Sequence, residues 1–315
     1  MKILVTGGCG YIGSVLIPKL LDMGYDVIAY DLMWFGNYLE PHDRLEIVHG
    51  DVRDTALVPM QNVTAVIHLA NVANDPCGDL DAKLVWEVNA LATMGLVEHA
   101  IANNVKQFIY ASSGSVYGVK QEDQVTEELS LVPISDYNKT KMISERILLS
   151  YADNIAVHIV RPATVCGLSP RMRLDVSVNM LTMQALKNQL ITVFGGDQVR
   201  PNIHIQDITD VFIHFLKKEN TDTGIYNAGF ENISILDIAN KVTDKIDAKI
   251  KITQSNDPRS YRLNADKLLS TGFVPGYSVD AAIDEIAEAV KKDRLKDQHS
   301  WYNVKTMKKM FNTDS

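Results

Sequence analysis

The sequence predicts an α/β fold in which amphipathic helices cover both faces of a doubly wound parallel sheet. Short apolar runs alternate with amphipathic stretches through the first half of the chain. Several runs, such as Ile3-Leu4-Val5 and Val66-Ile67-His68-Leu69, are almost continuously apolar, as is typical of strands buried on both faces. Strand–helix–strand alternation of this kind indicates a parallel sheet with helices on each side.

Each element is predicted from its own pattern. The strands are short apolar runs, which we place at Lys2–Thr6, Asp26–Tyr30, Leu45–His49, Ala65–Leu69, Gln107–Ala111 and Ala156–Val160. The helices have apolar residues at three- and four-residue spacing, and we place them at Tyr11–Met23, Lys83–Asn104 and Asn138–Tyr151. Each helix follows a strand, so each can pack its apolar face on the sheet.

The pattern changes after about residue 165, where Pro170 and a group of arginines precede further elements. The later elements are predicted at Asp175–Leu190, Arg200–Ile205, Ile225–Gly229, Ser234–Ile246 and Val279–Lys292. They indicate a second, smaller lobe. A basic amphipathic stretch with Lys305, Lys308 and Lys309 ends the chain, and predicts either a solvated closing helix or a partner-binding tail.

Composition and charge narrow the class of protein. The 315 residues are 46% hydrophobic and 22% charged, as in ordinary globular proteins. The net charge of −8, from 31 basic and 39 acidic residues, disfavours nucleic acid as a partner. Three scattered cysteines predict neither a disulfide framework nor a metal site. We find no signal peptide or membrane-spanning run, and therefore expect a cytoplasmic protein.

A glycine-rich turn follows the first predicted strand and opens the first predicted helix. Its glycines, Gly7, Gly10 and Gly13, have the spacing G-x-x-G-x-x-G. Gly7 permits a tight turn, Gly10 lets the backbone approach a diphosphate, and Gly13 allows close helix packing. The helix start, at Tyr11 and Ile12, would present N–H groups and a positive dipole end to phosphates. This context predicts a dinucleotide site.

Two acidic residues end the next two strands. Asp31 ends the second predicted strand, where a carboxylate accepts hydrogen bonds from ribose hydroxyls and repels a 2′-phosphate. It therefore predicts NAD rather than NADP, the alternative being an ordinary turn residue. Asp51, followed by Val52, ends the third strand and is either an adenine contact or a loop cap.

A tyrosine and a lysine lie one helical turn apart, at Tyr137 and Lys141. An unperturbed tyrosine has a pKa of about 10, and lowering it by about three units requires roughly 4 kcal/mol of phenolate stabilisation. A nearby ammonium and a positive nicotinamide ring can provide it. Ser113 follows a strand at the carboxyl edge of the sheet, where its hydroxyl could bind the same substrate oxygen.

In combination these features resemble the extended short-chain dehydrogenase/reductase superfamily, in its sugar-nucleotide epimerase/dehydratase branch, and the resemblance covers nearly the whole chain. The branch's further patterns are present as His68-Leu69-Ala70, Val88-Asn89-Ala90-Leu91-Ala92-Thr93, Ser112-Ser113-Gly114-Ser115-Val116-Tyr117-Gly118, Arg161-Pro162-Ala163-Thr164-Val165 and Arg200-Pro201-Asn202-Ile203-His204-Ile205-Gln206-Asp207.

The resemblance implies a Rossmann-type sheet of about seven strands. It implies an NAD-binding domain of residues 1–165, to which 202–232 return, and a substrate lobe of 166–201 and 233–315. Tyr137 is then the base, Lys141 holds the nicotinamide ribose and lowers the tyrosine pKa, and Ser113 assists at the hydroxyl. Leu69, Ala70 and Asn89 join the cofactor residues, and a homodimer through helices 83–104 and 138–151 is expected.

A nucleoside-diphosphate sugar is the implied substrate, and local positive charge should bind it. Arg200 and Asn179 match residues that contact the diphosphate in the resembled family. Other arginines, which include Arg171 and Arg259, are either diphosphate ligands or ordinary surface charges. Asn71 is either a sugar contact or a loop residue.

Several reactions begin by oxidising a sugar carbon. The 4,6-dehydratases of the resembled family carry Asp-Glu after the active-site Ser or Thr, whereas Gly114-Ser115 stands here and cannot supply the acid and base of an elimination. We therefore favour a 4-epimerase. A 4-dehydrogenase or ketoreductase, and a catalytically silent NAD-binding protein, are the alternatives.

Overall fold

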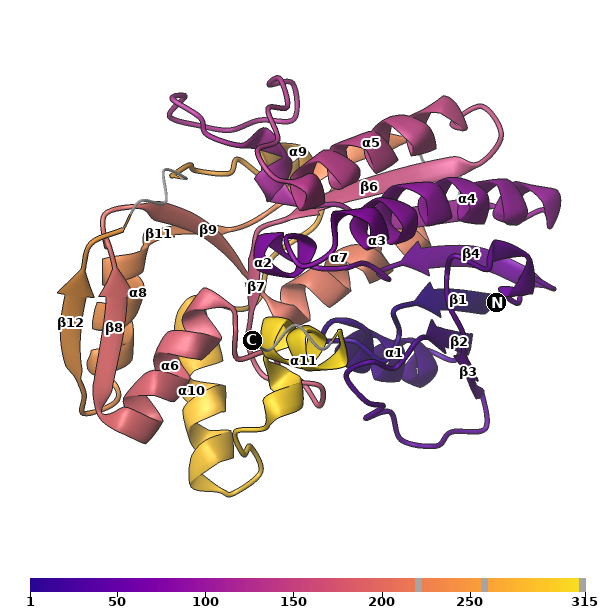
Figure 1. Ribbon diagram of the computed structural model, residues 1–315. Helices are drawn as coiled ribbons and strands as arrows, with labels where there is room; N and C mark the ends of the chain where they lie inside the picture. The colour runs from indigo at the N-terminus through magenta and orange to yellow at the C-terminus, as the bar shows by residue number, and fades with distance from the viewer. Residues whose placement is uncertain (219–222, 256–259, 312–315) are drawn as a thin grey trace.

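The computed structural model describes residues 1–218, 223–255 and 260–311. Its centre is a seven-stranded sheet in the order β10-β6-β5-β4-β1-β2-β3, and all six strand pairings are parallel. The strands are β1 (Lys2–Thr6), β2 (Asp26–Asp31), β3 (Leu45–His49), β4 (Val63–His68), β5 (Gln107–Ala111), β6 (Ala156–Pro162) and β10 (Gly224–Ala228). The predicted α/β fold with its doubly wound parallel sheet is confirmed (Figure 1).

Helices cover both faces of this sheet. Ile3 and Val5 of β1 pack into one layer with α1 and α7, while Leu4 packs into the opposite layer with α4 and α5. Because alternate side chains enter opposite layers, the strand must be apolar throughout. The helices of these layers are α1 (Gly13–Asp22), α4 (Ala92–Ala102), α5 (Asp136–Ser150) and α7 (Ile205–Lys217), while α3 (Ala82–Trp86) packs in a separate apolar cluster.

The predicted helix 83–104 is interrupted by one π-helical turn, Glu87–Leu91, between α3 and α4. Asn89, in this turn, is fully buried: its Oδ1 accepts the Val72 N–H at 2.9 Å and its Nδ2 donates to the Thr140 hydroxyl. The widened turn thereby connects the segment after β4 to α5. Such π turns are frequent at functional sites.

The carboxyl-side lobe contains two small sheets, β11-β9-β7 and β12-β8. Its elements are β7 (Thr164–Cys166), α6 (Ser177–Asn188), β8 (Leu190–Phe194), β9 (Val199–His204), β11 (Glu231–Ser234), α8 (Ile235–Thr243), β12 (Lys249–Thr253) and α10 (Val279–Lys291). Thus residues 202–204 lie in β9 of the small sheet, whereas α7 and β10 lie with the central sheet.

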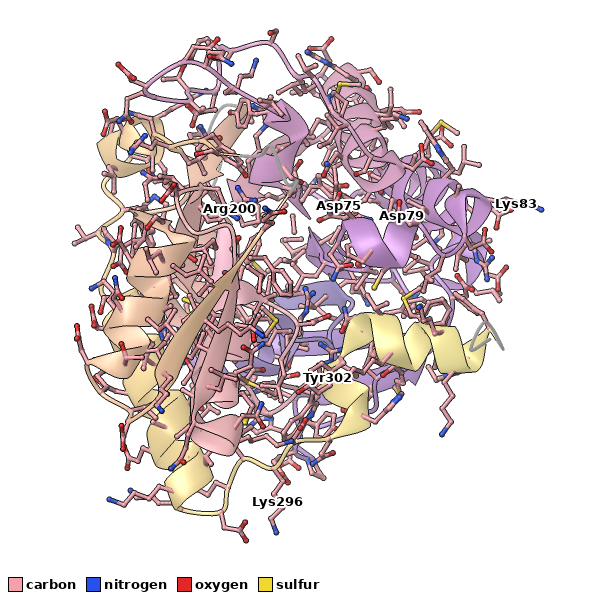
Figure 2. The ribbon with its side chains drawn as sticks, turned by 60° about the vertical axis from the view of Figure 1, so that its left-hand side comes forward. Asp75, Asp79, Lys83, Arg200, Lys296 and Tyr302 are labelled. Carbon is pink, nitrogen blue, oxygen red and sulfur yellow. The ribbon has the colours of Figure 1, made fainter. Side chains whose placement is uncertain are left out.

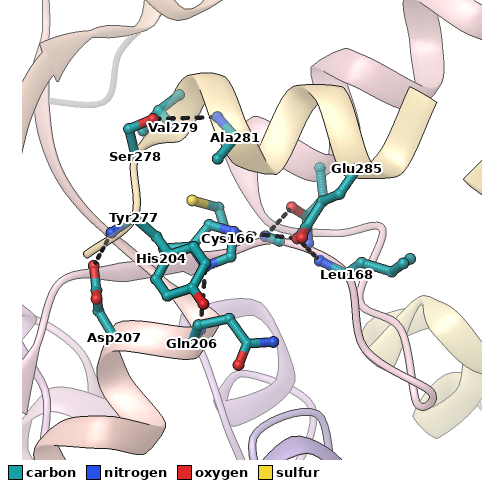
Figure 3. A network of polar contacts seen from close by, with 12 residues as sticks. Cys166, Leu168, His204, Gln206, Asp207, Tyr277, Ser278, Val279, Ala281 and Glu285 are labelled. Atoms are coloured by element: carbon teal, nitrogen blue, oxygen red, sulfur yellow. Dashed lines mark hydrogen bonds and ion pairs between the residues drawn. The ribbon is translucent and has the colours of Figure 1, made fainter. Parts of the chain in front are cut away.

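A polar network joins α10 to the small sheet (Figure 3). Glu285 of α10 accepts the Leu168 N–H and lies 3.2 Å from the Nε2 atom of His204, at the end of β9. Tyr277 stacks on the His204 ring, and Asp207 accepts the Tyr277 N–H. These contacts hold the loop after β7 in place, and this loop leads to the cavity described below.

Six shorter pieces complete the described elements: the helices α2 (Asp75–Gly78), α9 (Asp266–Ser270) and α11 (Asn303–Met310), and the 3-10 turns Thr55–Leu57, Gly114–Tyr117 and His299–Trp301. The final helix, α11, leaves the lobe and packs against α2 beside the central sheet (Figures 1 and 2). Across the described residues, no helix has the length and apolar composition needed to cross a bilayer.

Candidate active site

A cavity of about 560 Å³ lies at the carboxyl edge of the central sheet, between the sheet and the small lobe. The strand order reverses at this edge, because the chain proceeds from β1 to β2 and β3 on one side and from β4 to β5 and β6 on the other. Ligands of open α/β sheets bind at such a switch point. Asp75 of α2 and Arg200 of β9 line the cavity from the sheet side and the lobe side (Figure 2).

The glycine turn between β1 and α1 forms one part of the wall. Gly7 has φ +70°, and a Cβ atom there would lie 2.6 Å from the Ala70 backbone nitrogen. A Cβ on Gly13 would lie 2.3 Å from the Gly8 carbonyl oxygen, so α1 can begin only with glycine at this point. A Cβ atom on Gly10 would contact only the Gly7 carbonyl oxygen, at 3.1 Å, so there is room above the turn.

The turn is suited to a diphosphate. Gly7, Gly10, Gly13 and the residues between them, Tyr11 and Ile12, line the cavity. Because Ile12 at the N-cap has no polar side chain, the N–H group of Gly13 can serve an anion, whereas those of Ser14 and Val15 donate to the Gly10 and Ile12 carbonyls. The Tyr11 hydroxyl donates to the Gly167 carbonyl at 2.7 Å, which joins the turn to the lobe.

Asp31 presents a carboxylate to the same cavity. Its Oδ2 accepts the Cys9 N–H at 3.0 Å and its Oδ1 accepts the Met33 N–H at 2.7 Å, which fixes its orientation. Burial raises the pKa of Asp31, and these two backbone hydrogen bonds act in the opposite direction. An oriented carboxylate here can accept ribose hydroxyl groups.

Asp51 and Val52 also line the cavity, as do Leu69 and Ala70 after β4. The Asp51 carboxylate forms an ion pair with Arg53 at 2.7 Å and accepts the Arg53 N–H at 2.9 Å. It thus caps its own loop, the alternative left open by the sequence. Val52 and Leu69 give this part of the cavity an apolar surface, which suits a planar base.

The structure brings Ser113, Tyr137 and Lys141 together on the cavity wall. Tyr137 and Lys141 lie on α5, and the Lys141 ammonium is 5.8 Å from the Tyr137 ring centroid. Lys141 donates to the Ala111 carbonyl at the end of β5, at 2.6 Å. Ser113 accepts the Ser115 N–H and exchanges a 2.6 Å hydrogen bond with the Ser115 hydroxyl.

Burial dominates the protonation of this group. It raises the pKa of Tyr137 to about 12, while a hydrogen bond with Ser113 and the charge of Arg173 act in the lowering direction. Burial lowers the pKa of Lys141 to about 7, with Glu145 opposing the shift. The protein alone therefore favours a neutral phenol, and a positive charge from a bound ligand would be needed to favour the phenolate.

Two residues predicted from the sequence do not line the cavity. Asn89 is buried, and its side-chain amide forms hydrogen bonds with Val72 and Thr140. Asn179 is fully buried: its Oδ1 accepts the Gly167 N–H at 2.9 Å, and its Nδ2 donates to the Tyr11 hydroxyl and the Arg173 carbonyl. Its polar atoms are occupied by the protein, so it supports the loop after β7. Arg259 lies outside the described residues.

The remaining predicted substrate residues do line the cavity. Both amide atoms of Asn71 are buried without a hydrogen-bond partner among the described residues, so they can serve a ligand. Arg200 lies on the lobe side. Arg171 lies close enough to Asp31 for each charge to shift the other's pKa.

Several cavity residues were missed by the sequence analysis. Ser177 begins α6, and its buried hydroxyl has no partner among the described residues. Thr164 and Tyr261 also line the cavity, together with Ser115. Ser115 was visible in the motif that contains Ser113. The described residues contain no group of three or more His, Cys, Asp or Glu side chains that could hold a metal ion.

The parallel sheet, the glycine turn and the Tyr–Lys pair are the features of a dinucleotide-dependent enzyme with a tyrosine as candidate base. Residues 3–229 match the model of the NAD dependent epimerase/dehydratase family, and the chain belongs to that family. This confirms the resemblance predicted from the sequence, and NAD as the cofactor.

The chain is 29% identical to a UDP-glucose 4-epimerase of Lactobacillus helveticus over 276 residues, which cover 77% of this chain and 82% of the relative. It is 32% identical to a putative UDP-glucose 4-epimerase of Methanocaldococcus jannaschii over 227 residues, 69% and 74% of the two chains. A solved structure of the Bacillus cereus UDP-glucuronic acid 4-epimerase, in complex with UDP-glucuronic acid and NAD, superimposes with a TM-score of 0.82 at 27% identity, covering 93% and 99%.

Proposed function

We propose that the protein is a sugar-nucleotide 4-epimerase that acts on a nucleoside-diphosphate sugar. The observation that carries the proposal is the shared cavity, which joins the glycine turn and Asp31 to Ser113, Tyr137 and Arg200. The cofactor residues and a proton-accepting tyrosine thus face one space. The names of the relatives, which are 4-epimerases, support the same reaction.

The crowded surroundings of Gly114 argue against an elimination. A Cβ atom there would lie 3.2 Å from the Pro162 carbonyl oxygen and 3.5 Å from the Tyr261 hydroxyl, so an acidic side chain could enter only by moving backbone. Ser115, the next residue, donates its hydroxyl proton to the Asn138 side chain. The chain therefore lacks the acid–base pair that a 4,6-dehydratase uses at this place.

NAD, when bound, would accept a hydride from the sugar carbon and return it. Tyr137 would take the proton of the sugar hydroxyl as the hydride leaves, and give it back when the hydride returns to the other face of the keto sugar. Ser113, at hydrogen-bond distance from Ser115, would orient the sugar oxygen. Lys141, held by the Ala111 carbonyl, would bind the nicotinamide ribose and stabilise the phenolate.

The substrate diphosphate would meet the lobe side of the cavity. Arg200 supplies a guanidinium there, and the start of α6 supplies N–H groups and the Ser177 hydroxyl. Asn71 offers donor and acceptor atoms to the sugar.

The direct test is product analysis. Purified protein is screened against UDP, GDP, CDP and dTDP sugars by thermal shift, and each stabilising sugar nucleotide is incubated and followed by proton NMR. Appearance of the C4 epimer with no net change in nicotinamide absorbance supports the proposal. Net accumulation of NADH with a keto product would instead identify a dehydrogenase, and binding without any turnover would identify a silent NAD-binding protein.

We further propose a homodimer through α4 and α5, in a reducing compartment. Leu91 and Met94 are large apolar residues that remain 57% and 38% exposed at the start of α4, and a partner subunit could cover them. The three cysteines are free and buried. A light-scattering mass near the 35.1 kDa of one chain would contradict the dimer.

A further inference from the structure

Arg171 is a buried arginine whose Nε–H group has no acceptor among the described residues. Only 2% of the residue is exposed, and its Nη2 donates to the Asn303 Oδ1 at 2.6 Å. The guanidinium lies 4.3 Å above the ring of Phe35. Its Nε has no hydrogen-bond partner among the described residues, although Arg171 lines the cavity. A buried N–H without an acceptor is costly, which indicates that a ligand fills this position.

The neighbours of Arg171 belong to the cofactor side of the cavity. Phe35 follows β2 by a few residues, and Asp31, at the end of β2, is close enough to affect the Arg171 charge. Asp31 and the glycine turn are themselves joined, through the hydrogen bond from the Cys9 N–H. An anionic oxygen beside Arg171 would therefore lie between the ribose site and the diphosphate turn.

Helix α11 holds Arg171 in this place. Asn303, the first residue of α11, lines the cavity, and its N–H donates to the Asp175 carboxylate at 3.1 Å. Asp175 in turn pairs with Arg173 at 2.9 Å. The start of α11 is thus fixed to the 171–175 segment by two separate contacts.

The rest of α11 bridges the two sides of the cofactor region. Met307 packs in one apolar cluster that joins the loop after β2 to α2 and α3; the cluster contains Trp34, Phe35, Val72, Cys77, Leu80, Leu84, Val85, Val88, Val304, Met307 and Phe311. Trp34 meets Phe311 edge to face, with ring centroids 5.9 Å apart. In Figures 1 and 2 α11 lies directly beside α2.

We propose that Arg171 binds the diphosphate of NAD, not the nucleotide sugar, and that α11 is part of the cofactor site, holding Arg171 through Asn303 and covering the bound dinucleotide. A guanidinium suits phosphate oxygens, and α11 spans the region between Asp31 and α2 over which the dinucleotide extends. NAD can then leave only after α11 separates from Trp34 and Phe35. The cofactor would stay bound over many turnovers.

The test measures cofactor release rather than activity. Trp34 lines the cavity, so its emission can be transferred to bound NADH, and a chase with excess NAD gives the NADH dissociation rate. Arg171→Met keeps an apolar chain on Phe35 and removes the charge. We expect it to raise the NADH dissociation rate and the NAD Kd about tenfold or more, with the affinity for nucleotide sugar changed less than about twofold.

Two variants of α11, made in the full-length protein, test whether this helix covers the bound dinucleotide. Asn303→Leu removes the acceptor of Arg171 and should speed NADH dissociation several-fold, while Lys309→Ala, on the exposed side of the helix, should leave it unchanged. Because Asn303→Leu leaves Arg171 intact, it remains informative even if Arg171→Met fails to fold.

Other outcomes would overturn the proposal. If Arg171→Met weakens nucleotide-sugar binding and leaves NADH release unchanged, Arg171 is a substrate ligand. If the wild type binds NADP as tightly as NAD and Arg171→Met abolishes only NADP binding, the arginine serves a 2′-phosphate. Unchanged NADH release in Asn303→Leu would exclude α11 from the cofactor site. The measurements of NADH release and of NAD and NADP affinity do not depend on which sugar is the substrate.

Discussion

The two sides of the cavity are built in different ways. The side that we assign to the cofactor comes mainly from the first 75 residues and depends on backbone: glycine positions without space for a Cβ, a helix start and one oriented carboxylate. The side that we assign to the substrate is assembled from side chains of separate segments, among them Ser115, Ser177, Arg200 and Tyr261. A position that requires a particular backbone geometry tolerates few residue types, whereas a side chain on the cavity wall can be exchanged without altering the fold.

This difference explains why the cofactor was easier to predict than the substrate. A glycine turn has a short, contiguous signature, and its predicted cofactor residues, Gly7 and Gly10 to Gly13, line the cavity. The substrate residues lie far apart in the chain, and each can be exchanged for other polar residues. If the two sides are built in these different ways, substitutions on the cofactor side should change stability and NAD binding, whereas substitutions on the substrate side should change the rate of hydride transfer.

The largest effect is expected from Tyr137→Phe, on the substrate side. Removing the phenol oxygen should slow hydride transfer about 10²–10⁴-fold and leave nucleotide-sugar affinity nearly intact, because the oxygen acts mainly in the transition state. Single-turnover traces of nicotinamide absorbance, with a binding titration beside them, measure both quantities. Near-normal hydride transfer would place the base elsewhere.

On the cofactor side, Gly13→Ala should act on stability. Its Cβ would collide with the Gly8 carbonyl, so we expect a loss of about 2 kcal/mol or more in the free energy of unfolding. In Gly10→Ala the new Cβ would contact only one atom, at 3.1 Å. This variant should lose little free energy of unfolding and bind NAD more weakly. Urea unfolding and NAD titration separate the two.

Gly272→Ala is the control for glycine loss itself. Gly272 has φ +91° and nothing within 4 Å of its Cβ position, so this variant should cost about 1 kcal/mol and leave NAD binding unchanged. If Gly10→Ala and Gly13→Ala lower the free energy of unfolding equally and weaken NAD binding equally, then Gly13 is not needed specifically for the fold, nor Gly10 specifically for the ligand.

Lys141 should make stability depend on pH. Its folded pKa of about 7 lies below its usual value of 10.5, so between these values the unfolded chain binds more protons and stability rises with pH. The stability gained by Lys141→Met should therefore be greatest below pH 7 and shrink as the pH rises toward 10. Urea unfolding at several pH values measures this, with Lys139→Met, exposed on the same helix, as the control. A gain independent of pH would show that Lys141 is not desolvated.

The smallest effect is expected from Asp31→Asn. Loss of the carboxylate removes the repulsion of a 2′-phosphate and weakens the ribose hydrogen bonds, so the preference for NAD over NADP should fall about tenfold. Titration of both cofactors measures the ratio, and Asp26→Asn at the exposed start of β2 serves as the control. Tighter NADP than NAD binding in the wild type would contradict the assignment of Asp31.

Much of the fold follows from local patterns. All six predicted strands of the first half are present. Five of them are largely buried and mostly apolar, whereas β3, at the edge of the sheet, is only partly buried. The π turn at Glu87–Leu91 could not be predicted, since it depends on Asn89 reaching Val72 and Thr140. Strands β8 and β12 were not predicted, although Lys249–Thr253 alternates polar and apolar residues.

The site shows the same division. Ser113, Tyr137 and Lys141 were found because their spacing within a motif has a chemical reason, and they share one wall. Ser177 was missed because a serine at a helix start is common, and only its position at the cavity distinguishes it. The place of Arg171 beside Asp31 depends on α11, whose basic sequence indicates only an amphipathic helix.

The position of α11 also bears on how the protein is made. The strand–turn–helix unit of β1 and α1, which we assign to the diphosphate, ends at Asp22. Helix α11, which packs against Trp34, is the last described helix to leave the ribosome. Chains are synthesised at about 5–20 residues per second, and amino-terminal units fold first. On our proposal, a nascent chain whose central sheet is complete after β10 has an open dinucleotide site until α11 is made. NAD can enter during this interval, before α11 covers the site.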